Sequence, residues 1–324
     1  MTNDRFLITG ALGCIGAWTL RNLVREGVPV ASLNRGRNLQ RLELLLSPEE
    51  IARIQFITGD ISDLGVVESA IKDSGANRII HLAALQLPFC KADPPRGALV
   101  NVVGTVNIFE AAKRAGIRQV VYSSSTAVYG LSEEYPESPL QNDAALDPRS
   151  HYGVYKQANE GTARIYWMDD RIASIGLRPY VVYGAGRDQG MTSTPTVAML
   201  AAVCGQPYHI SYGKRYGFQY GDDVAKCFIR CARTPFEGAE AFNVGGPSVS
   251  TAEVIAAIEK IEPAARGKIT FDDIPLPFPE EVDSSALEKV IGPLPYTPLE
   301  QGVAETMDIF RKALKEGKIS PLEA

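Results

Sequence analysis

Short apolar runs alternate with longer amphipathic stretches along the first half of the chain. The runs are rich in the branched residues typical of buried strands, and the stretches between them repeat apolar residues at helical spacing. Such alternation predicts a parallel sheet whose right-handed crossovers are helices. We therefore expect an α/β fold with a doubly wound parallel sheet. The predicted strands lie at residues 5–8, 28–33, 54–57, 78–81, 120–123 and 173–177.

The pattern changes in the second half of the chain, where proline and glycine interrupt the apolar runs. Residues 184–195 predict a loop, and six prolines between residues 275 and 298 predict a segment rich in turns. At 324 residues the chain can bury a large core and form two lobes. We expect a sheet domain over residues 1–180, to which segments at about 215–245 return, and a small lobe over residues 181–324.

Three segments predict long helices. Residues 98–115 form an amphipathic pattern, and a helix opened by residue 151 runs to about residue 168. Residues 299–315 carry an apolar stripe at helical spacing, which is typical of core packing rather than of a partner site.

A glycine-rich loop follows the first predicted strand and precedes a helical pattern. Gly10 allows a tight turn, Gly13 lets a pyrophosphate approach the backbone, and Gly16 lets the helix pack closely on the strand. The free N–H groups of the helix, which opens at Cys14 and Ile15, then favour an anion. A plain strand–turn–helix connection is the alternative. The strand–loop–helix context indicates a Rossmann-type domain that binds NAD or NADP.

The end of the second predicted strand bears on the choice between these cofactors. An acidic residue here normally binds the adenosine ribose, but this chain has Asn34, followed by Arg35 and Arg37. Without the carboxylate, a 2′-phosphate is not repelled, and the arginines could hold it. This favours NADP slightly. The alternative is that Asn34 binds the ribose of NAD and the arginines are solvated.

Hydroxyl groups and a Tyr–Lys pair supply the candidate chemistry. Ser123 and Ser125 end an apolar strand, at the edge where α/β folds bind ligands. Tyr152 and Lys156 share one face of the next helix. The ammonium of Lys156 should lower the Tyr152 pKa toward neutrality, so that Tyr152 acts as general base or acid while a serine hydrogen-bonds the reacting oxygen. Lys156 could also hold the nicotinamide ribose. Taken alone, the pair could be an ordinary surface pair.

These motifs follow one another over nearly the whole chain, which resembles the extended short-chain dehydrogenases/reductases of the NAD-dependent epimerase/dehydratase group. The resemblance is carried by the glycine loop, the Tyr–Lys pair and several shorter stretches. These stretches are Gly59-Asp60-Ile61, His81-Leu82-Ala83-Ala84, Asn101-Val102-Val103-Gly104-Thr105, residues 123–130, Leu177-Arg178-Pro179 and residues 220–225.

The resemblance implies roles for individual residues. Ser125 matches the family's catalytic hydroxyl, beside Tyr152 and Lys156, and Asn101 would lie near the nicotinamide. Two long helices of the family often build a dimer interface, which implies a homodimer. The remaining expected cofactor-binding residues flank the adenine (Asp60 and Ile61), line the phosphates and ribose (Leu82, Ala83 and Ala84) or adjoin them (Ser123 and Pro179).

Three departures separate the chain from the sugar-nucleotide enzymes of that group. Thr126-Ala127 replaces the Asp-Glu pair of the 4,6-dehydratases, so the acid for dehydration is missing. Valine replaces a diphosphate-binding asparagine within residues 178–184, and Tyr216 replaces a phosphate-binding arginine. These absences favour a smaller substrate, such as a free sugar, sugar acid, lactone or polyol. The alternative is that Arg187 or Arg215 replaces the missing contacts.

Five residues are expected to face this substrate. Gln86 could hydrogen-bond a hydroxyl group, and Cys90 follows it in the same stretch. The alternative for Cys90 is a small buried apolar residue, the commoner fate of a free cysteine. Thr126, Tyr180 and Arg187 complete the expected substrate-facing set.

Composition restricts the partners. The hydrophobic fraction is 45%, the charged fraction 22% and the net charge −5, with no basic stripe, which argues against a nucleic-acid partner. No apolar run is long enough to cross a bilayer, and the first strand starts too early for a signal peptide, so we expect a cytoplasmic protein without membrane contact. Five cysteines without a Cys-x-x-Cys pair and three histidines indicate reduced thiols and no metal site.

Together these observations predict an NAD(P)-dependent enzyme that transfers hydride to or from a secondary alcohol of a carbohydrate-like substrate. A dehydrogenase is the first interpretation, and a sugar or nucleotide-sugar epimerase is the alternative. A non-catalytic, cofactor-sensing regulator is a third, because fold alone does not fix function.

Overall fold

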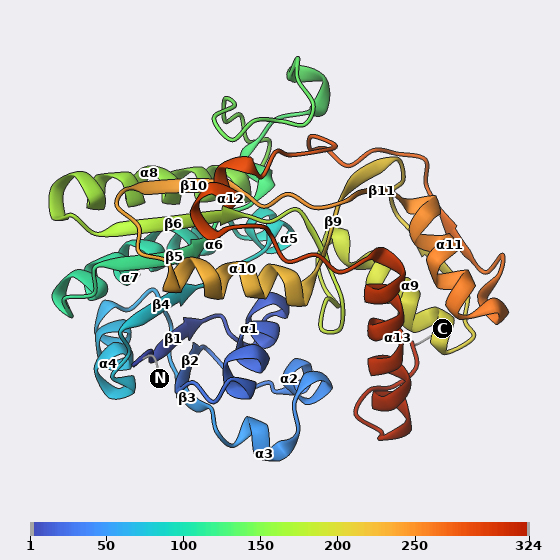
Figure 1. Ribbon diagram of the computed structural model, residues 1–324, viewed down its shortest axis with the longest axis horizontal. Coiled ribbons are helices and arrows are strands. Elements are labelled where there is room, and N and C mark those ends of the chain that lie inside the picture. The colour runs from blue at the N-terminus through green and yellow to red at the C-terminus, as the bar shows by residue number, and fades with distance from the viewer. Residues whose placement is uncertain (1–2, 323–324) are drawn as a thin grey trace.

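The computed structural model describes residues 3–322 of the chain, built around a seven-stranded sheet (Figure 1). All neighbouring strands are parallel, in the order β10-β6-β5-β4-β1-β2-β3. This confirms the α/β, Rossmann-type fold. The strands are β1 (Phe6–Thr9), β2 (Val30–Asn34), β3 (Gln55–Thr58), β4 (Arg78–His81), β5 (Gln119–Ser123), β6 (Ala173–Arg178) and β10 (Ala239–Asn243).

Helices cover both faces of the sheet because successive strand residues point to opposite sides. Phe6 and Ile8 of β1 pack into one buried cluster, whereas Leu7 between them packs into the other. The first cluster lies under α1 (Cys14–Arg25) and α10 (Gly221–Arg233). The second lies under α4 (Leu64–Ser74), α7 (Gly104–Arg114) and α8 (His151–Asp170).

The helix expected at residues 98–115 differs from the prediction. It is continuous with α6 (Pro94–Ala98), passes through a π-helical turn at Leu99–Val103 and continues as α7. The side chain of Asn101 in this turn holds both backbone groups of Leu85, through Asn101 Oδ1 (2.7 Å) and Asn101 Nδ2 (2.9 Å). The widened turn thus brings Asn101 to the loop after β4, a contact that periodicity cannot reveal.

The C-terminal lobe lies to one side of the main sheet (Figure 1). Its three-stranded sheet has the order β11-β9-β7, and two further strands, β8 and β12, pair in parallel. Tyr183 of β7 stacks on Phe218 of β9, with ring centroids 4.0 Å apart. The strands are β7 (Val181–Tyr183), β8 (Tyr208–Ile210), β9 (Arg215–Tyr220), β11 (Ser248–Ser250) and β12 (Ile269–Phe271), and the long helices are α9 (Thr194–Val203), α11 (Thr251–Ile261) and α13 (Leu299–Lys315).

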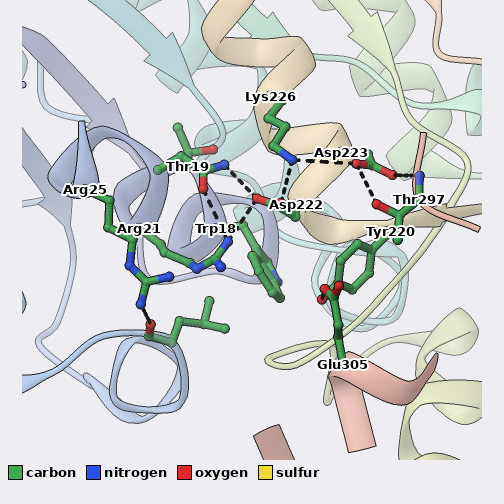
Figure 2. Close-up of polar contacts among 12 residues, drawn as sticks. Trp18, Thr19, Arg21, Arg25, Tyr220, Asp222, Asp223, Lys226, Thr297 and Glu305 are labelled. Carbon is green, nitrogen blue, oxygen red and sulfur yellow. Dashed lines mark hydrogen bonds and ion pairs between the residues drawn. The ribbon is translucent and has the colours of Figure 1, made fainter. Parts of the chain in front are cut away.

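Two carboxylates at the start of α10 bind segments that are distant in the sequence, as Figure 2 shows. Asp222 accepts hydrogen bonds from Arg21 (3.1 Å) and Asn22 (2.8 Å) of α1. Asp223 accepts from the backbone N–H (2.7 Å) and hydroxyl (3.0 Å) of Thr297, just before α13. Lys226 lies close to both carboxylates. The corner between β9 and α10 is therefore fixed to two distant segments of the chain.

The remaining helices are short. Within residues 3–322, no helix combines the length and apolar character needed to cross a membrane. The short α-helices are α2 (Gln40–Leu45), α3 (Pro48–Ile51), α5 (Leu87–Ala92) and α12 (Ser285–Ile291), and the 3-10 helices are Thr126–Val128, Ser132–Glu134, Met191–Ser193 and Pro263–Ala265.

Candidate active site

A cavity of about 390 Å³ opens at the carboxyl ends of β1, β4 and β5. The loops after these strands form one side, and α8 contributes Tyr152 and Lys156. Further lining comes from residues 179–182, 187 and 189–192 and from Phe278 of the proline-rich segment. The cavity therefore brings together the glycine loop and the Tyr–Lys pair, which are about 140 residues apart in the sequence.

The glycine loop has the geometry of a phosphate cradle. A Cβ at Gly10 would lie 2.5 Å from the backbone N of Ala83, and one at Gly16 would lie 2.5 Å from Cα of Ala11, so neither position has room for a side chain. At Gly13 a Cβ would meet only the carbonyl of Gly10, at 3.2 Å. α1 has no side-chain cap and no acidic residue in its first turn. Its free N–H groups and the bare backbone at Gly13 fit the pyrophosphate of a dinucleotide.

Cys14 and Ile15, which open α1, also line the cavity. Burial raises the pKa of the Cys14 thiol to about 11. This thiol is therefore protonated at neutral pH, and it belongs to the wall of the cavity rather than to its reactive groups.

The residues expected at the adenosine ribose do not line the cavity. Asn34 Oδ1 accepts from the backbone N–H of Leu12 (3.1 Å), and its Nδ2 donates to Ser32 (2.9 Å), so the amide braces the glycine loop. Arg35 is exposed, and the guanidinium of Arg37 lies 4.8 Å from the ring centroid of Phe56.

Asp60 and Ile61, expected at the adenine, also lie outside the cavity lining. Asp60 forms an ion pair with Arg96 of α6 (2.6 Å) and accepts from Ser62, and these contacts lower its pKa to about 2 although burial opposes the shift. The side chain of Ile61 is buried against Gly104, where a Cβ would lie 2.6 Å from Ile61 Cδ1. Asn101 is buried on Leu85, whereas Leu82, Ala83, Ala84, Ser123 and Pro179 all line the cavity.

Ser125, Tyr152 and Lys156 meet in the cavity. Ser125 follows β5, and its hydroxyl accepts from the backbone N–H of Ala127. Lys156 is 3% exposed; its ammonium donates to the carbonyl of Ser123 and lies 5.6 Å from the ring centroid of Tyr152. This arrangement places an acid–base hydroxyl, a second hydroxyl and a cation around one space.

The expected lowering of the Tyr152 pKa by Lys156 is wrong for this structure. Burial raises the pKa of Tyr152, and the opposing influences are contact with the Ser125 hydroxyl and the charge of Arg187 rather than Lys156. Burial also lowers the pKa of Lys156 to about 8. The lysine sits where its charged form is itself disfavoured, and spacing on a helix does not reveal this cost.

A buried ion pair behind the serines escaped the sequence analysis. Arg178 at the end of β6 binds both carboxylate oxygens of Glu160 on α8, through Arg178 Nε (2.9 Å) and Arg178 Nη2 (2.7 Å). Ser124 donates to the same carboxylate (2.5 Å). This pair fixes α8, and with it Tyr152, against the ends of β5 and β6. The only signal in the sequence is that Glu160 lies one helical turn after Lys156.

Four of the five residues expected to face the substrate do line the cavity: Gln86, Thr126, Tyr180 and Arg187. The expectation for Cys90 is wrong, because its side chain is fully buried and its thiol donates to the carbonyl of Leu85 (3.2 Å). Cys90 therefore takes the apolar role that was the alternative. The other cavity-lining side chains absent from the sequence analysis include Arg41, Gln189 and Phe278, which come from three separate segments.

Arg215 does not replace the missing phosphate contacts. Its guanidinium binds Glu253 (3.0 Å) and the carbonyl of Ser248 on the exposed side of β9. Tyr216 beside it is fully buried, and its hydroxyl accepts a hydrogen bond from Thr251 (3.2 Å). Of the two arginines considered, only Arg187 reaches the cavity. In the described part of the chain, no three His, Cys, Asp or Glu side chains are grouped as metal ligands.

Comparison with known proteins agrees with this geometry. The model of the NAD dependent epimerase/dehydratase family matches residues 6–245. The UDP-glucose 4-epimerase of Mycolicibacterium smegmatis is 32% identical, over 95% of this chain and 98% of that protein. MoeE5, solved with UDP-glucuronic acid and NAD, is 25% identical with a TM-score of 0.80, over 96% of this chain and 100% of that chain.

The L-threonine dehydrogenase of Clostridium difficile has the same fold, with a TM-score of 0.81 over 98% of this chain and 99% of that chain. Its identity to this chain is 23%. One fold thus carries both epimerases and dehydrogenases, and the reaction has to be argued from the site.

Proposed function

This chain belongs to the NAD-dependent epimerase/dehydratase family, and on that premise we propose that it is an NAD-dependent epimerase of a sugar or nucleotide sugar. Membership makes it an NAD-dependent epimerase or dehydrogenase of the extended short-chain type. The observation that carries the proposal is the meeting of Ser125, Tyr152 and Lys156 with the glycine loop in one cavity. The epimerase, which the sequence left as the alternative, is favoured over the dehydrogenase by the 32% identity to a UDP-glucose 4-epimerase.

The side chains divide the chemistry among them. Bound NAD supplies a reversible acceptor for the hydride of the carbinol carbon. Tyr152, as phenolate, removes the hydroxyl proton as the C–H bond breaks, and it returns that proton when the carbonyl is reduced from its other face. Ser125 donates a hydrogen bond to the reacting oxygen. Contact with the Ser125 hydroxyl and the charge of Arg187 favour a phenolate at Tyr152, because they oppose the rise in its pKa that burial causes.

We infer that the cofactor is NAD, and the comparisons do not support the preference for NADP drawn from Asn34 and its arginines. Both ends of the Asn34 amide are engaged, with Leu12 and Ser32. Arg37 lies over Phe56. MoeE5 was solved with NAD.

A dehydrogenase of a small carbohydrate is the second candidate. It is favoured by the outward orientation of Arg215 and the burial of Tyr216, which leave the lobe without a cluster of arginines for a diphosphate. A non-catalytic regulator is disfavoured because Ser125, Tyr152 and Lys156 are all present and all line the cavity.

We also propose a homodimer, formed through the helices on one face of the sheet. Val154, Ile165 and Met168 of α8 are between 46% and 58% exposed. Leu99 and Val103 of the adjoining π-helical turn are about as exposed, at 39% and 41%. An apolar row on two neighbouring helices is typical of a surface covered by another subunit.

Two measurements test the reaction. Mass spectrometry of small molecules released from the freshly purified, denatured protein should find NAD near one per chain, because an epimerase recycles its own cofactor. Incubation with UDP-glucose, UDP-glucuronic acid and the corresponding free sugars should convert one of them to its epimer without accumulating reduced nicotinamide. Stoichiometric reduced nicotinamide with a keto product would support the dehydrogenase instead, and absence of both reactions would contradict either enzyme.

A further inference from the structure

The cavity carries an excess of positive charge. Among the residues that the structure describes, its lining includes Arg41, Lys156 and Arg187 but no aspartate or glutamate. A positively charged cavity without carboxylates favours anionic ligands. The pyrophosphate of a dinucleotide is one such ligand, and the glycine loop would hold it. A second anion would require a cation that is not already paired.

Two of the three cations already have partners. Arg41 binds the carboxylate of Asp188 through Arg41 Nη2 (2.6 Å) and Arg41 Nε (3.1 Å), and it donates to the carbonyl of Leu12 (3.1 Å). Lys156 donates to the carbonyl of Ser123. The charge of Arg41 is thus balanced by Asp188, and the ammonium of Lys156 is held beside the ring of Tyr152.

Arg187 is different. Within residues 3–322 its guanidinium forms no ion pair; its one hydrogen bond goes from Nη2 to the hydroxyl of Thr192 (2.8 Å). Its Nε–H is buried and has no partner. A buried donor on a charged group without an acceptor costs free energy, so a ligand that supplies the acceptor binds favourably.

Other polar groups line the same cavity. Gly190 has a φ of +94°, and a Cβ there would lie 2.4 Å from Gln86 Oε1 and 3.5 Å from Arg187 Nη2. The amide of Gln86, just before α5, and the guanidinium of Arg187, in the loop after β7, therefore approach the same glycine. The hydroxyl of Tyr180, which also lines the cavity, is buried without a partner.

We propose that Arg187 and Gln86 bind a carboxylate of the substrate, so that the enzyme acts on a sugar acid. The inference rests on the proposed hydride-transfer function and narrows its substrate class. A guanidinium matches a planar carboxylate with two parallel hydrogen bonds, and one free arginine balances one such charge. A diphosphate, with more charge, is normally held by several cations.

The position of Arg187 relative to the reacting group sets where the carboxylate lies on the sugar. Arg187 and Tyr152 line the same cavity, and the charge of Arg187 opposes the rise in the Tyr152 pKa that burial causes. The carboxylate is then borne by a carbon close to the carbinol carbon, as in a hexuronic acid that reacts at the neighbouring position. That acid is either free or linked to a nucleoside diphosphate.

The test compares acid and neutral members of two substrate pairs. The pairs are UDP-glucuronic acid with UDP-glucose, and galacturonic acid with galactose. For the wild-type protein we expect a higher kcat/KM for the acid of one pair, and which pair reacts identifies the source. In Arg187→Met the ratio of kcat/KM for the acid to kcat/KM for the neutral sugar should fall about 10- to 100-fold, beyond any loss that both substrates share because the Tyr152 phenolate is less stabilised. Arg215→Met, which removes an exposed arginine outside the cavity, is the matched control and should keep the preference.

The competing assignment is that Arg187 serves the dinucleotide, since its charge also acts on Cys14 in the glycine loop. NAD content of each purified variant is therefore measured by mass spectrometry. Loss of NAD from Arg187→Met with an unchanged acid preference would overturn the inference, as would a wild-type protein that turns over the neutral sugar equally well.

If the wild-type protein turns over neither pair, the proposed function fails by itself, and binding decides the inference. Equilibrium dialysis of each acid and its neutral partner against the NAD-loaded protein then replaces kcat/KM. Tighter binding of an acid that is lost in Arg187→Met and kept in Arg215→Met supports the carboxylate site. Equal binding of acid and neutral sugar refutes it.

Discussion

The two ends of the cavity are built from different parts of the polypeptide. At the glycine loop the ligand meets backbone: Gly10 and Gly16 have no room for a side chain, and the N–H groups of α1 are uncapped. At the other end it meets side chains, among them Tyr152, Tyr180 and Arg187; the Tyr180 hydroxyl and Arg187 Nε have no hydrogen-bond partner. The glycine loop has its binding geometry without a ligand, whereas the side-chain end has polar groups for which a ligand would supply the hydrogen-bond partner.

This difference reflects what each end recognises. A pyrophosphate is the same in every dinucleotide, so a fixed backbone cradle with a helix N-terminus is sufficient. A substrate differs from enzyme to enzyme, and side chains on loops can change without disturbing the sheet. The loop at residues 184–193 and Phe278 of the proline-rich segment supply that variable wall. If the two ends are independent, substitutions should damage one without the other.

Removing the Tyr152 hydroxyl should give the largest effect and should affect the side-chain end alone. Tyr152→Phe removes the group that carries the proton, so we expect kcat to fall about 10³-fold with NAD content unchanged. The measurement is single-turnover conversion together with mass spectrometry of bound NAD. Tyr155→Phe is the control, because the Tyr155 hydroxyl donates to the carbonyl of Pro94 (2.9 Å) and lies outside the cavity. Equal turnover of Tyr152→Phe and wild type would remove Tyr152 from the mechanism.

Damage to the backbone end should instead reduce stability and NAD binding. In Gly10→Ala the new Cβ would press on the backbone of Ala83 at 2.5 Å, and the φ of +68° is strained for alanine. We expect a loss of about 2–4 kcal/mol in the free energy of unfolding and a protein isolated without NAD. Gly27→Ala separates the two causes, because its φ is +72° and nothing lies within 4 Å.

Gly27→Ala should cost about 1 kcal/mol and should keep its NAD. Chemical denaturation of both variants checks the difference. Equal losses would mean that backbone conformation, and not contact with Ala83, makes Gly10 necessary.

Acid should weaken the backbone end more than the C-terminal lobe. His81 at the end of β4 is buried between the hydroxyls of Thr9 (2.6 Å) and Thr105 (3.1 Å), and Thr105 donates onward to the carbonyl of Asn101. This order of donors suits a neutral imidazole, and burial, assisted by the charge of Lys156, lowers the His81 pKa to about 3. The unfolded chain, with a His pKa near 6.5, binds the proton more readily, so stability falls as the pH drops below about 6.5 and continues to fall until about 3.

Through His81, the free energy of unfolding should therefore be about 2 kcal/mol lower at pH 5 than at pH 7. His81→Gln should show a shallower loss between these pH values in denaturant titrations. The control is His209→Gln, since His209 is exposed beside Asp272 in the lobe. If His81→Gln and wild type lose stability in parallel, His81 is not the group that takes up the proton.

The two ends also differ in how far the sequence predicts them. The strand–glycine–helix order predicted the cradle because only glycine tolerates the contacts at Gly10 and Gly16. The residue type itself therefore indicates the steric requirement of the backbone. The parallel sheet followed from the alternation of apolar runs. The π-helical turn at Leu99–Val103 did not, because it shifts the helical repeat by only one residue.

The side-chain end was predicted only in part, because its geometry depends on contacts between distant segments. Arg41 of the short helix α2 and Phe278 of the proline-rich segment reach the cavity with no local signal in the sequence, and Glu160 acquires its role only through Arg178. Cys90 was expected at the substrate because of its position in the chain, but it turns inward to the carbonyl of Leu85. Sequence spacing shows which residues share a helix face; it does not show how deeply they are buried or with which partner.

The smallest expected effect concerns the outer edge of the backbone end, where the two cofactors differ. In Asn34→Asp the new carboxylate can still accept from the N–H of Leu12, while Ser32 reverses its bond and donates. The added charge repels a 2′-phosphate. The Kd for NADP should therefore rise relative to the Kd for NAD by about fivefold, or ~1 kcal/mol. Asn38→Asp adds the same charge four residues away at an exposed site and is the matched control. Fluorescence titration with both reduced cofactors measures the ratios.

A shift in Asn34→Asp alone would place the ribose next to Asn34, even though its amide now faces the glycine loop. Equal shifts in both variants would instead indicate a long-range effect of net charge. Residues of the cradle other than Asn34 would then determine the choice of cofactor.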